Sequence, residues 1–196
     1  MRPRLASTIR LLAALLLALQ GGCAVTQQEG AAQYLDETTG NTVLAVAAPI
    51  VFARERTDVA AHARDYATLV AVAVDRSGRY DQYLLVYRWS TVDRRMSPPP
   101  DAAAGALRLL ADGRQIDLRP EARMPVDIGQ RASLRAPAHA DLVARAYRVD
   151  EATLQFIAAS RELRLLMPQE SLRIPFTLWE DGRAALARYL AQIGGS

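Results

Sequence analysis

The sequence predicts an α+β fold: a mainly antiparallel β-sheet, made of hairpins in a sandwich-like arrangement, with a short helix and a C-terminal helix packed on it. Two observations support this prediction. Apolar, β-branched runs are joined by turns that are too short for the crossover connections of a parallel sheet. Helical periodicity is confined to residues 151–160 and to the C-terminus.

The first half of the chain predicts one interrupted strand followed by a hairpin. Thr42–Phe52 is apolar and β-branched, and Pro49, which has no amide donor, favours an edge strand or a bulge there. Residues 54–65 are charged around an Ala-rich centre, which predicts one helical turn. Tyr66–Val74 and Tyr80–Thr91 flank a glycine-containing turn and predict a β-hairpin. Because the second of these strands is apolar on both faces, we expect it to be central and covered on each side.

The next segment predicts a second hairpin and a long loop. Leu107–Ala111 and Arg114–Leu118 flank Asp112-Gly113, the preferred pair for a type I′ turn. Residues 119–140 contain three prolines and little periodicity, so we expect a surface loop, and a loop of this length is a candidate binding segment. Asp141–Val149 alternates as a strand.

The C-terminal part predicts two helices and one more strand pair. Asp150 is a candidate N-cap for a helix over Glu151–Ser160. Glu162–Met167 and Leu172–Leu178 predict paired strands. Asp181 is a candidate cap for a closing helix, Gly182–Ile193. The apolar residues that fall on one face of this helix are Leu186, Tyr189, Leu190 and Ile193.

The first twenty-three residues have the layout of an export signal. Arginines at positions 2, 4 and 10 precede an apolar run, Leu11–Leu19, which is followed by Gln20-Gly21-Gly22-Cys23. As a helix this run is ~13 Å long, too short to span a hydrocarbon core of ~30 Å. The basic start favours translocation of everything that follows.

The residues before Cys23 resemble the lipobox of bacterial lipoproteins, in which small residues precede a cysteine that is lipidated and becomes the mature N-terminus. Gly21 and Gly22 fit that pattern, whereas Gln20 stands where the family usually has Leu. Ordinary cleavage after Ala24 is therefore an alternative, because Gly22 and Ala24 form a small-x-small site. The resemblance implies a membrane anchor on Cys23. Ala24 after the cysteine resembles lipoproteins that are exported to the inner leaflet of the outer membrane, facing the periplasm.

This interpretation divides the chain into a signal peptide (1–22), a lipidated tether (23–40) and a single β-rich domain (41–196). The formal net charge of +3 comes from Arg2, Arg4 and Arg10, because the remaining 21 arginines are balanced by 21 acidic residues. A balanced mature chain gives no electrostatic support for nucleic-acid binding. Cys23 is the only cysteine, so the mature chain forms no internal disulfide.

The sequence contains no nucleophile-elbow, phosphate-loop or dinucleotide-binding motif, and we expect no cofactor and no metal site. The two histidines, His62 and His139, lie in separate loops without a metal-binding pattern. Asp75 and Asp81 flank the first hairpin turn, where Asp is favoured as a turn residue rather than as half of a catalytic carboxylate pair.

An aromatic stripe forms either part of the core or a ligand or partner surface. It consists of Tyr83, Tyr87 and Trp89, joined by Trp179.

We expect a lipid-anchored envelope protein that binds or scaffolds other envelope proteins without catalysis. An envelope hydrolase without a recognisable motif and a periplasmic small-ligand binding protein are the alternatives.

Overall fold

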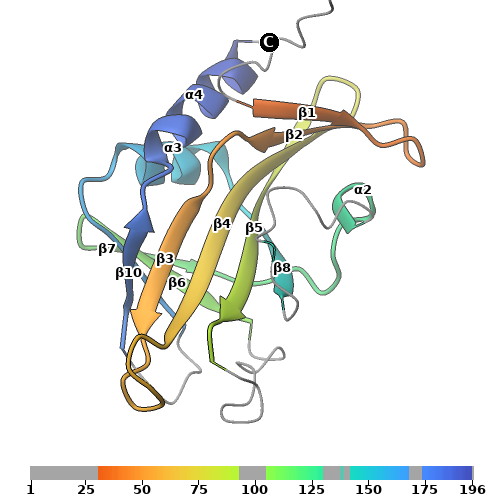
Figure 1. The fold of residues 1–196 in the computed structure, drawn as a ribbon. Coiled ribbons are helices and arrows are strands. Elements are labelled where there is room, and N and C mark those ends of the chain that lie inside the picture. Colours follow the sequence, from red (N-terminus) through yellow and green to blue (C-terminus); the bar gives the residue numbers. More distant parts are fainter. Residues whose placement is uncertain (1–30, 93–104, 130–137, 139–141, 168–173, 196) are drawn as a thin grey trace, which may run out of the picture.

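A curled antiparallel sheet dominates the computed structural model, which describes residues 31–92, 105–129, 138, 142–167 and 174–195 (Figure 1). The strands are β1 (Ala31–Leu35), β2 (Thr42–Val46), β3 (Ile50–Glu55), β4 (Arg64–Asp75), β5 (Tyr80–Ser90), β6 (Leu107–Ala111), β7 (Arg114–Leu118), β8 (Val143–Arg148), β9 (Leu163–Leu166) and β10 (Phe176–Glu180). The helices in this part of the chain are α2 (Val126–Gly129), α3 (Glu151–Ala159) and α4 (Arg183–Gly194). The arrangement confirms the predicted α+β class.

Strands β2 and β3 are two parts of one long strand that is interrupted at Pro49. Both pair with the same edge of β4, with Ala45 opposite Val72 and Ile50 opposite Leu69. An edge strand or a bulge was expected at Pro49. The ladder is interrupted there and its register shifts between the Ala45–Val72 and Ile50–Leu69 pairs, since proline cannot donate to a ladder. Beyond it the sheet divides, because β2 pairs with β1 on its outer edge whereas β3 pairs with β10.

The hairpin of β4 and β5 is the centre of the sheet and confirms the prediction. Its turn uses left-handed conformations at Ser77 (φ 57°) and Gly78 (φ 86°). Strand β5 pairs with β4 along its whole length and with β8 on its other edge. Six consecutive residues of β5, from Tyr83 to Arg88, are buried, as expected for a strand covered on both faces.

The sheet curls until its two ends approach each other. From one end the strand order is β8, β5, β4, β3, β10, β9, β6 and β7. Pro120, just after β7, forms an isolated bridge with Tyr147 of β8, and the amide of Glu121 donates to the carbonyl of Ala146 at 2.8 Å. Apolar side chains on the inner face form much of the core. This inner face includes four buried side chains that lie opposite one another on the successive strands β10, β9, β6 and β7: Phe176, Leu165, Leu109 and Ile116.

Helices α3 and α4 pack against each other, and α4 also contacts β1 and β2. Asp150 caps α3, accepting a hydrogen bond from the amide of Thr153 at 2.6 Å as predicted. Asp181 accepts from the amide of Arg183 at 3.1 Å at the start of α4. The four residues predicted to form the apolar face of α4 are all buried: Leu186, Tyr189, Leu190 and Ile193.

Three segments differ from the sequence prediction. The sheet begins at Ala31 rather than near Asn41, so β1 occupies part of the segment expected to be a tether. Residues 54–55 complete β3 and Arg64 opens β4, where one helical turn was expected, because the two strands pair as far as Glu55 and Arg64. The short helix α2 lies within the predicted loop 119–140. In the first two cases pairing with a neighbouring strand decides the local structure.

Candidate functional site

The predicted stripe is divided between the core and the surface. Tyr83 and Tyr87 have relative exposures of only 3% and 1%, so they are core residues and do not form a partner surface. They are buried because β5 is covered on both faces, and burial raises the pKa of Tyr87 to about 12. Trp89, two residues further along the same face, is partly exposed. Cys23 and His139 lie outside the described residues.

The structure brings Trp89 together with Trp179 through Tyr66, which the sequence analysis did not single out. The rings of Tyr66 and Trp89 stack, with centroids 4.0 Å apart and an interplanar angle of 8°. Trp179 meets Tyr66 in a T-shaped contact at 6.1 Å and 83°. The guanidinium of Arg64 lies over the Trp179 ring, 4.9 Å from its centroid. Such aromatic contacts each contribute about 0.5–1.5 kcal/mol beyond their buried area.

These side chains share the outer face of the curled sheet. Tyr66 pairs with Ala53 and with Trp89, and Ala53 pairs with Thr177, so all of them point to the same side. Arg164 of β9 lies opposite Thr177 and also points outward. We refer to Arg64, Tyr66, Trp89, Arg164 and Trp179 as the aromatic–arginine patch.

A small residue makes the patch continuous across the sheet. Strand β3 lies between β10 and β4, so Trp179 reaches Tyr66 only by crossing above β3. The residue of β3 opposite Tyr66 is Ala53, whose methyl group leaves room for that crossing. A bulge between Leu178 and Glu180 in β10 sets the direction of Trp179. The indole is 52% exposed although it belongs to a strand.

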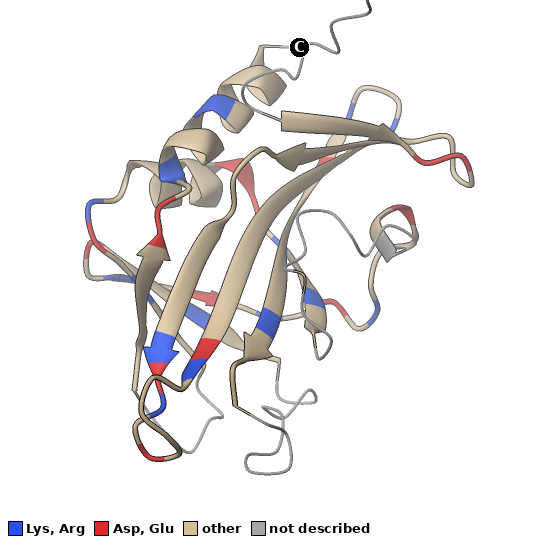
Figure 2. Cartoon of the chain, in the orientation of Figure 1, with Lys and Arg blue, Asp and Glu red and all other residues tan. Residues whose placement is uncertain are grey.

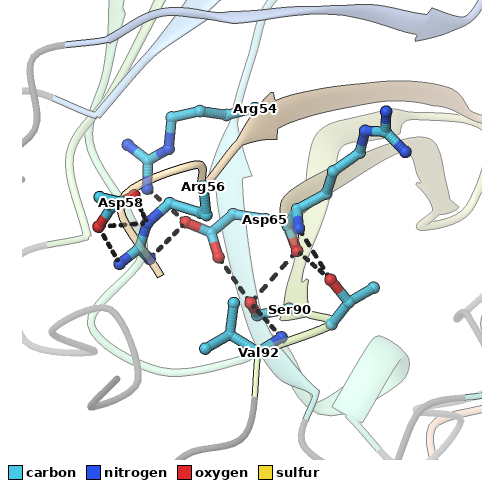
Figure 3. A network of polar contacts seen from close by, with 8 residues as sticks. Arg54, Arg56, Asp58, Asp65, Ser90 and Val92 are labelled. Atoms are coloured by element: carbon cyan, nitrogen blue, oxygen red, sulfur yellow. Dashed lines mark hydrogen bonds and ion pairs between the residues drawn. The ribbon is translucent and has the colours of Figure 1, made fainter. Parts of the chain in front are cut away.

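A buried ion-pair network lies in the same strands, next to the patch (Figure 3). The carboxylate of Asp65 accepts hydrogen bonds from Arg54 Nη2 at 2.6 Å, Arg56 Nη1 at 3.1 Å and Ser90 Oγ at 2.6 Å. Asp65 and Ser90 are opposite one another, as are Tyr66 and Trp89 in the next register position. Basic and acidic positions accordingly lie side by side at this end of β3 and β4 (Figure 2). The network fixes the strand ends that hold the patch.

The charges in this network persist at neutral pH. Burial by itself would raise the pKa of Asp65, but hydrogen bonds from Arg54, Ser90 and Arg56 outweigh it, and the pKa lies below its usual value. A hydrogen bond to Asp58, followed by one to Asp65, raises the pKa of Arg56. An ionised carboxylate with three donors is suited to a structural role, and the exposed groups of the patch are suited to binding.

Other candidates from the sequence take structural positions. Asp75 accepts from the amide of Gly78 at 2.7 Å, and Asp81 pairs with Arg76 at 3.0 Å, as expected for residues that organise a turn. His62 lies exposed in a turn with φ 66°. Within the described part of the chain, no group of three or more His, Cys, Asp or Glu residues could hold a metal ion.

A groove lies between α3 and α4. Gln155, Ala158, Ala187, Leu190 and Ala191 are among the residues that line it. A small-ligand binding protein was expected to use a pocket lined by Tyr83 or Trp89, and neither residue lines this groove.

Sequence reasoning could have found Tyr66. The first hairpin turn places Asp75 opposite Tyr80. Nine residues further from the turn on each strand, the same register places Tyr66 opposite Trp89. Arg64 lies two residues before Tyr66, so the same alternation places it on the same face. Arg164 had no comparable signal, because its position depends on the pairing of β9 with β10.

No helix in the described ranges is long and apolar enough to cross a membrane. No protein-family model matches the chain, and no curated protein or solved structure is significantly similar to it.

Proposed function

We propose that this protein is a lipid-anchored component of the cell envelope, attached through Cys23 to the inner leaflet of the outer membrane and facing the periplasm. Its role is to bind or scaffold other envelope proteins without catalysis. The single observation that supports the anchor is the order of the N-terminal residues: arginines, an apolar run, then Gly21-Gly22-Cys23. The exposed aromatic–arginine patch supports binding, since Trp, Tyr and Arg dominate interaction surfaces.

The anchor and the sheet are close together in the sequence. Residues 24–30 separate Cys23 from Ala31, the first residue of β1. A chain of this length spans at most ~28 Å when fully extended. A lipid on Cys23 would therefore hold the sheet near the membrane surface, with the β1 end nearest to the anchor.

Intact mass of the purified protein tests the anchor. We expect a chain that begins at Cys23 and bears two or more acyl groups, because a single chain gives only marginal membrane binding. Cys23→Ser should release the protein from the membrane fraction. A mature chain that begins at Val25 without acyl mass would contradict the proposal, and fractionation with inner-membrane markers would contradict the outer-membrane location.

A further inference from the structure

We propose that the aromatic–arginine patch binds an acidic segment of a partner protein, in which carboxylates flank an aromatic or aliphatic side chain. The proposal deepens the function above by naming the chemistry of the partner. The patch consists only of Trp, Tyr and Arg, which are the residue types that contribute most to protein interfaces. The exposed indole of Trp179 is the natural anchor for an apolar side chain.

The two arginines give the patch its preference for carboxylates. Among the described residues, the Arg64 side chain makes one hydrogen bond, from Nη2 to Glu55 Oε1 at 3.3 Å, which engages one of the five N–H donors of its guanidinium group. Arg164 is exposed and has no ion pair among the described residues. Guanidinium groups match planar carboxylates in a two-pronged geometry. Glu55 is the carboxylate that pairs with Arg64, at 3.3 Å, and its own side chain is exposed.

The patch is also organised in advance of binding. Its aromatic side chains project from paired strands and are packed against one another, and the Asp65 network fixes the adjoining strand ends. Side chains that are already ordered lose little conformational freedom on association. Affinity can therefore come from a small number of contacts.

A membrane surface is the less suitable partner. Adsorption to anionic lipid generally requires a cluster of several basic residues, whereas the patch has two arginines beside Glu55. The patch also lies on the half of β4 that pairs with β3, away from the half that pairs with β2 and through it with β1. If Cys23 is anchored as proposed, the patch is displaced from the membrane.

Selection from a random dodecapeptide phage library tests the proposal. The targets are the full mature chain, in phosphatidylcholine nanodiscs if it is lipidated, and the same protein with Trp179→Ala. We expect peptides that combine Asp or Glu with an aromatic or aliphatic residue to be enriched on the parent and not on the variant. Enrichment of basic or uncharged peptides, or equal enrichment on both targets, would overturn the proposal.

Tryptophan fluorescence then measures the affinity of the most enriched peptide. The chain has two tryptophans and both belong to the patch, so the signal reports on this surface. We expect Trp179→Phe to weaken binding and Trp179→Ala to weaken it at least about tenfold. Arg64→Gln and Arg164→Gln should each weaken it about threefold to tenfold, as should amidation of the peptide's carboxylates. Binding should also weaken at high salt.

Two control variants lie at the other end of β4, where Asp127 pairs with Arg76. Val126→Ala removes an equally exposed apolar side chain, and Arg79→Gln removes an exposed charge. Neither should change peptide affinity. Because Arg164 is exposed and forms no ion pair with the part of the chain that the structure describes, a folded Arg164→Gln protein that binds as tightly as the parent would contradict the role assigned to charge.

Vesicles of phosphatidylglycerol distinguish the membrane alternative. Binding to these vesicles that is lost in Trp179→Ala, with no acidic peptide enriched, would replace the partner protein by a lipid surface and overturn the proposal. These assays use the purified chain whether or not it carries lipid. A failed anchor test and a failed patch test are therefore distinguishable.

Discussion

At the scale of single residues, Asp65 is the most consequential side chain in the structure. Its carboxylate is buried and accepts from two arginines and a serine, and Arg54 is itself buried with its guanidinium over the Phe176 ring. A buried ion pair of this kind is costly to break, because removing one partner leaves the other charge without compensation.

Asp65→Asn should lower the free energy of unfolding by about 3–5 kcal/mol at neutral pH. Because the folded-state pKa of Asp65 lies below its unfolded value of about 3.9, ionised Asp65 stabilises the fold above that value. This contribution is lost as the pH falls through the lowered pKa, so parent and variant should converge in acid. Denaturant unfolding from pH 7 down to about pH 2 measures both effects.

Asp58→Asn is the matched control, since Asp58 also pairs with Arg56 but is exposed. It should change stability far less than Asp65→Asn does. Equal effects of the two substitutions would show that the buried pair does not stabilise the fold.

Gly182 is a second residue whose identity the tertiary structure requires. A Cβ atom there would overlap the backbone carbonyl of Pro49, although the φ of −86° suits any residue. Gly182→Ala should therefore destabilise the protein by about 1–3 kcal/mol through overpacking alone. Gly194→Ala, where the nearest atom is Glu151 Oε1 at 3.8 Å, should be neutral or slightly stabilising. Thermal unfolding of both variants checks this, and equal midpoints would contradict it.

At the scale of elements, α4 stabilises the fold through its apolar face rather than through its intrinsic propensity. Leu190 is buried on that face. Leu190→Ala should cost about 2–5 kcal/mol because it leaves a cavity, and chemical denaturation of the mature chain measures it. Ala187→Ser, on the exposed side of the same helix, should have little effect. An unchanged denaturation midpoint for Leu190→Ala would mean that α4 does not cover a core.

Strand β1 is the element that sequence periodicity did not reveal. Its five residues pair with β2 from Ala31–Val46 to Leu35–Thr42, and Ala31 is buried. A chain that starts at Asn41 should be less stable by at least ~2 kcal/mol than one that starts at Ala31, because the edge of β2 becomes exposed. Denaturation midpoints of the two chains test this. Matching midpoints would mean that residues 31–40 behave as the tether that the sequence suggested.

At the scale of the whole molecule, the curled sheet has a seam where β7 approaches β8. The backbone contacts described there are the isolated bridge from Pro120 to Tyr147 and the hydrogen bond from Glu121 to Ala146. An ion pair between Arg148 and Glu121, at 3.5 Å, also crosses the seam. The tyrosine hydroxyl also donates to the carbonyl of Gly105. The seam has far fewer backbone hydrogen bonds than the continuous ladder of β4 and β5.

The amide of Glu121 should therefore exchange with solvent at least ~100-fold faster than the amides of Leu69–Val74, because local opening needs to break only the seam. Amide hydrogen exchange followed by NMR compares the two directly. Similar protection for both would indicate that the curled sheet opens only by global unfolding.

The sequence by itself determined the elements whose signals are local. Asp112-Gly113 specified a hairpin turn, and the structure has both residues at positive φ, 48° and 79°. Asp150 specified a helix start, and the spacing of Leu186 and Leu190 specified the buried face of α4. The turn and the helix cap are contacts between residues a few positions apart, and the apolar face of α4 follows from helical spacing, so propensity and periodicity predict them.

Only the tertiary structure decided what depends on distant pairing. Strand β10 pairs with β3 although the two are far apart in the sequence, and the small side chain of Ala53 lets Trp179 reach Tyr66 across β3. Likewise, Tyr87 and Trp89 lie on the same face of β5, yet Tyr87 is buried in the core whereas Trp89 is partly exposed. The physical reason is that a strand's period of two specifies which side chains share a face, whereas the strands and helices that cover the face decide which of them are buried.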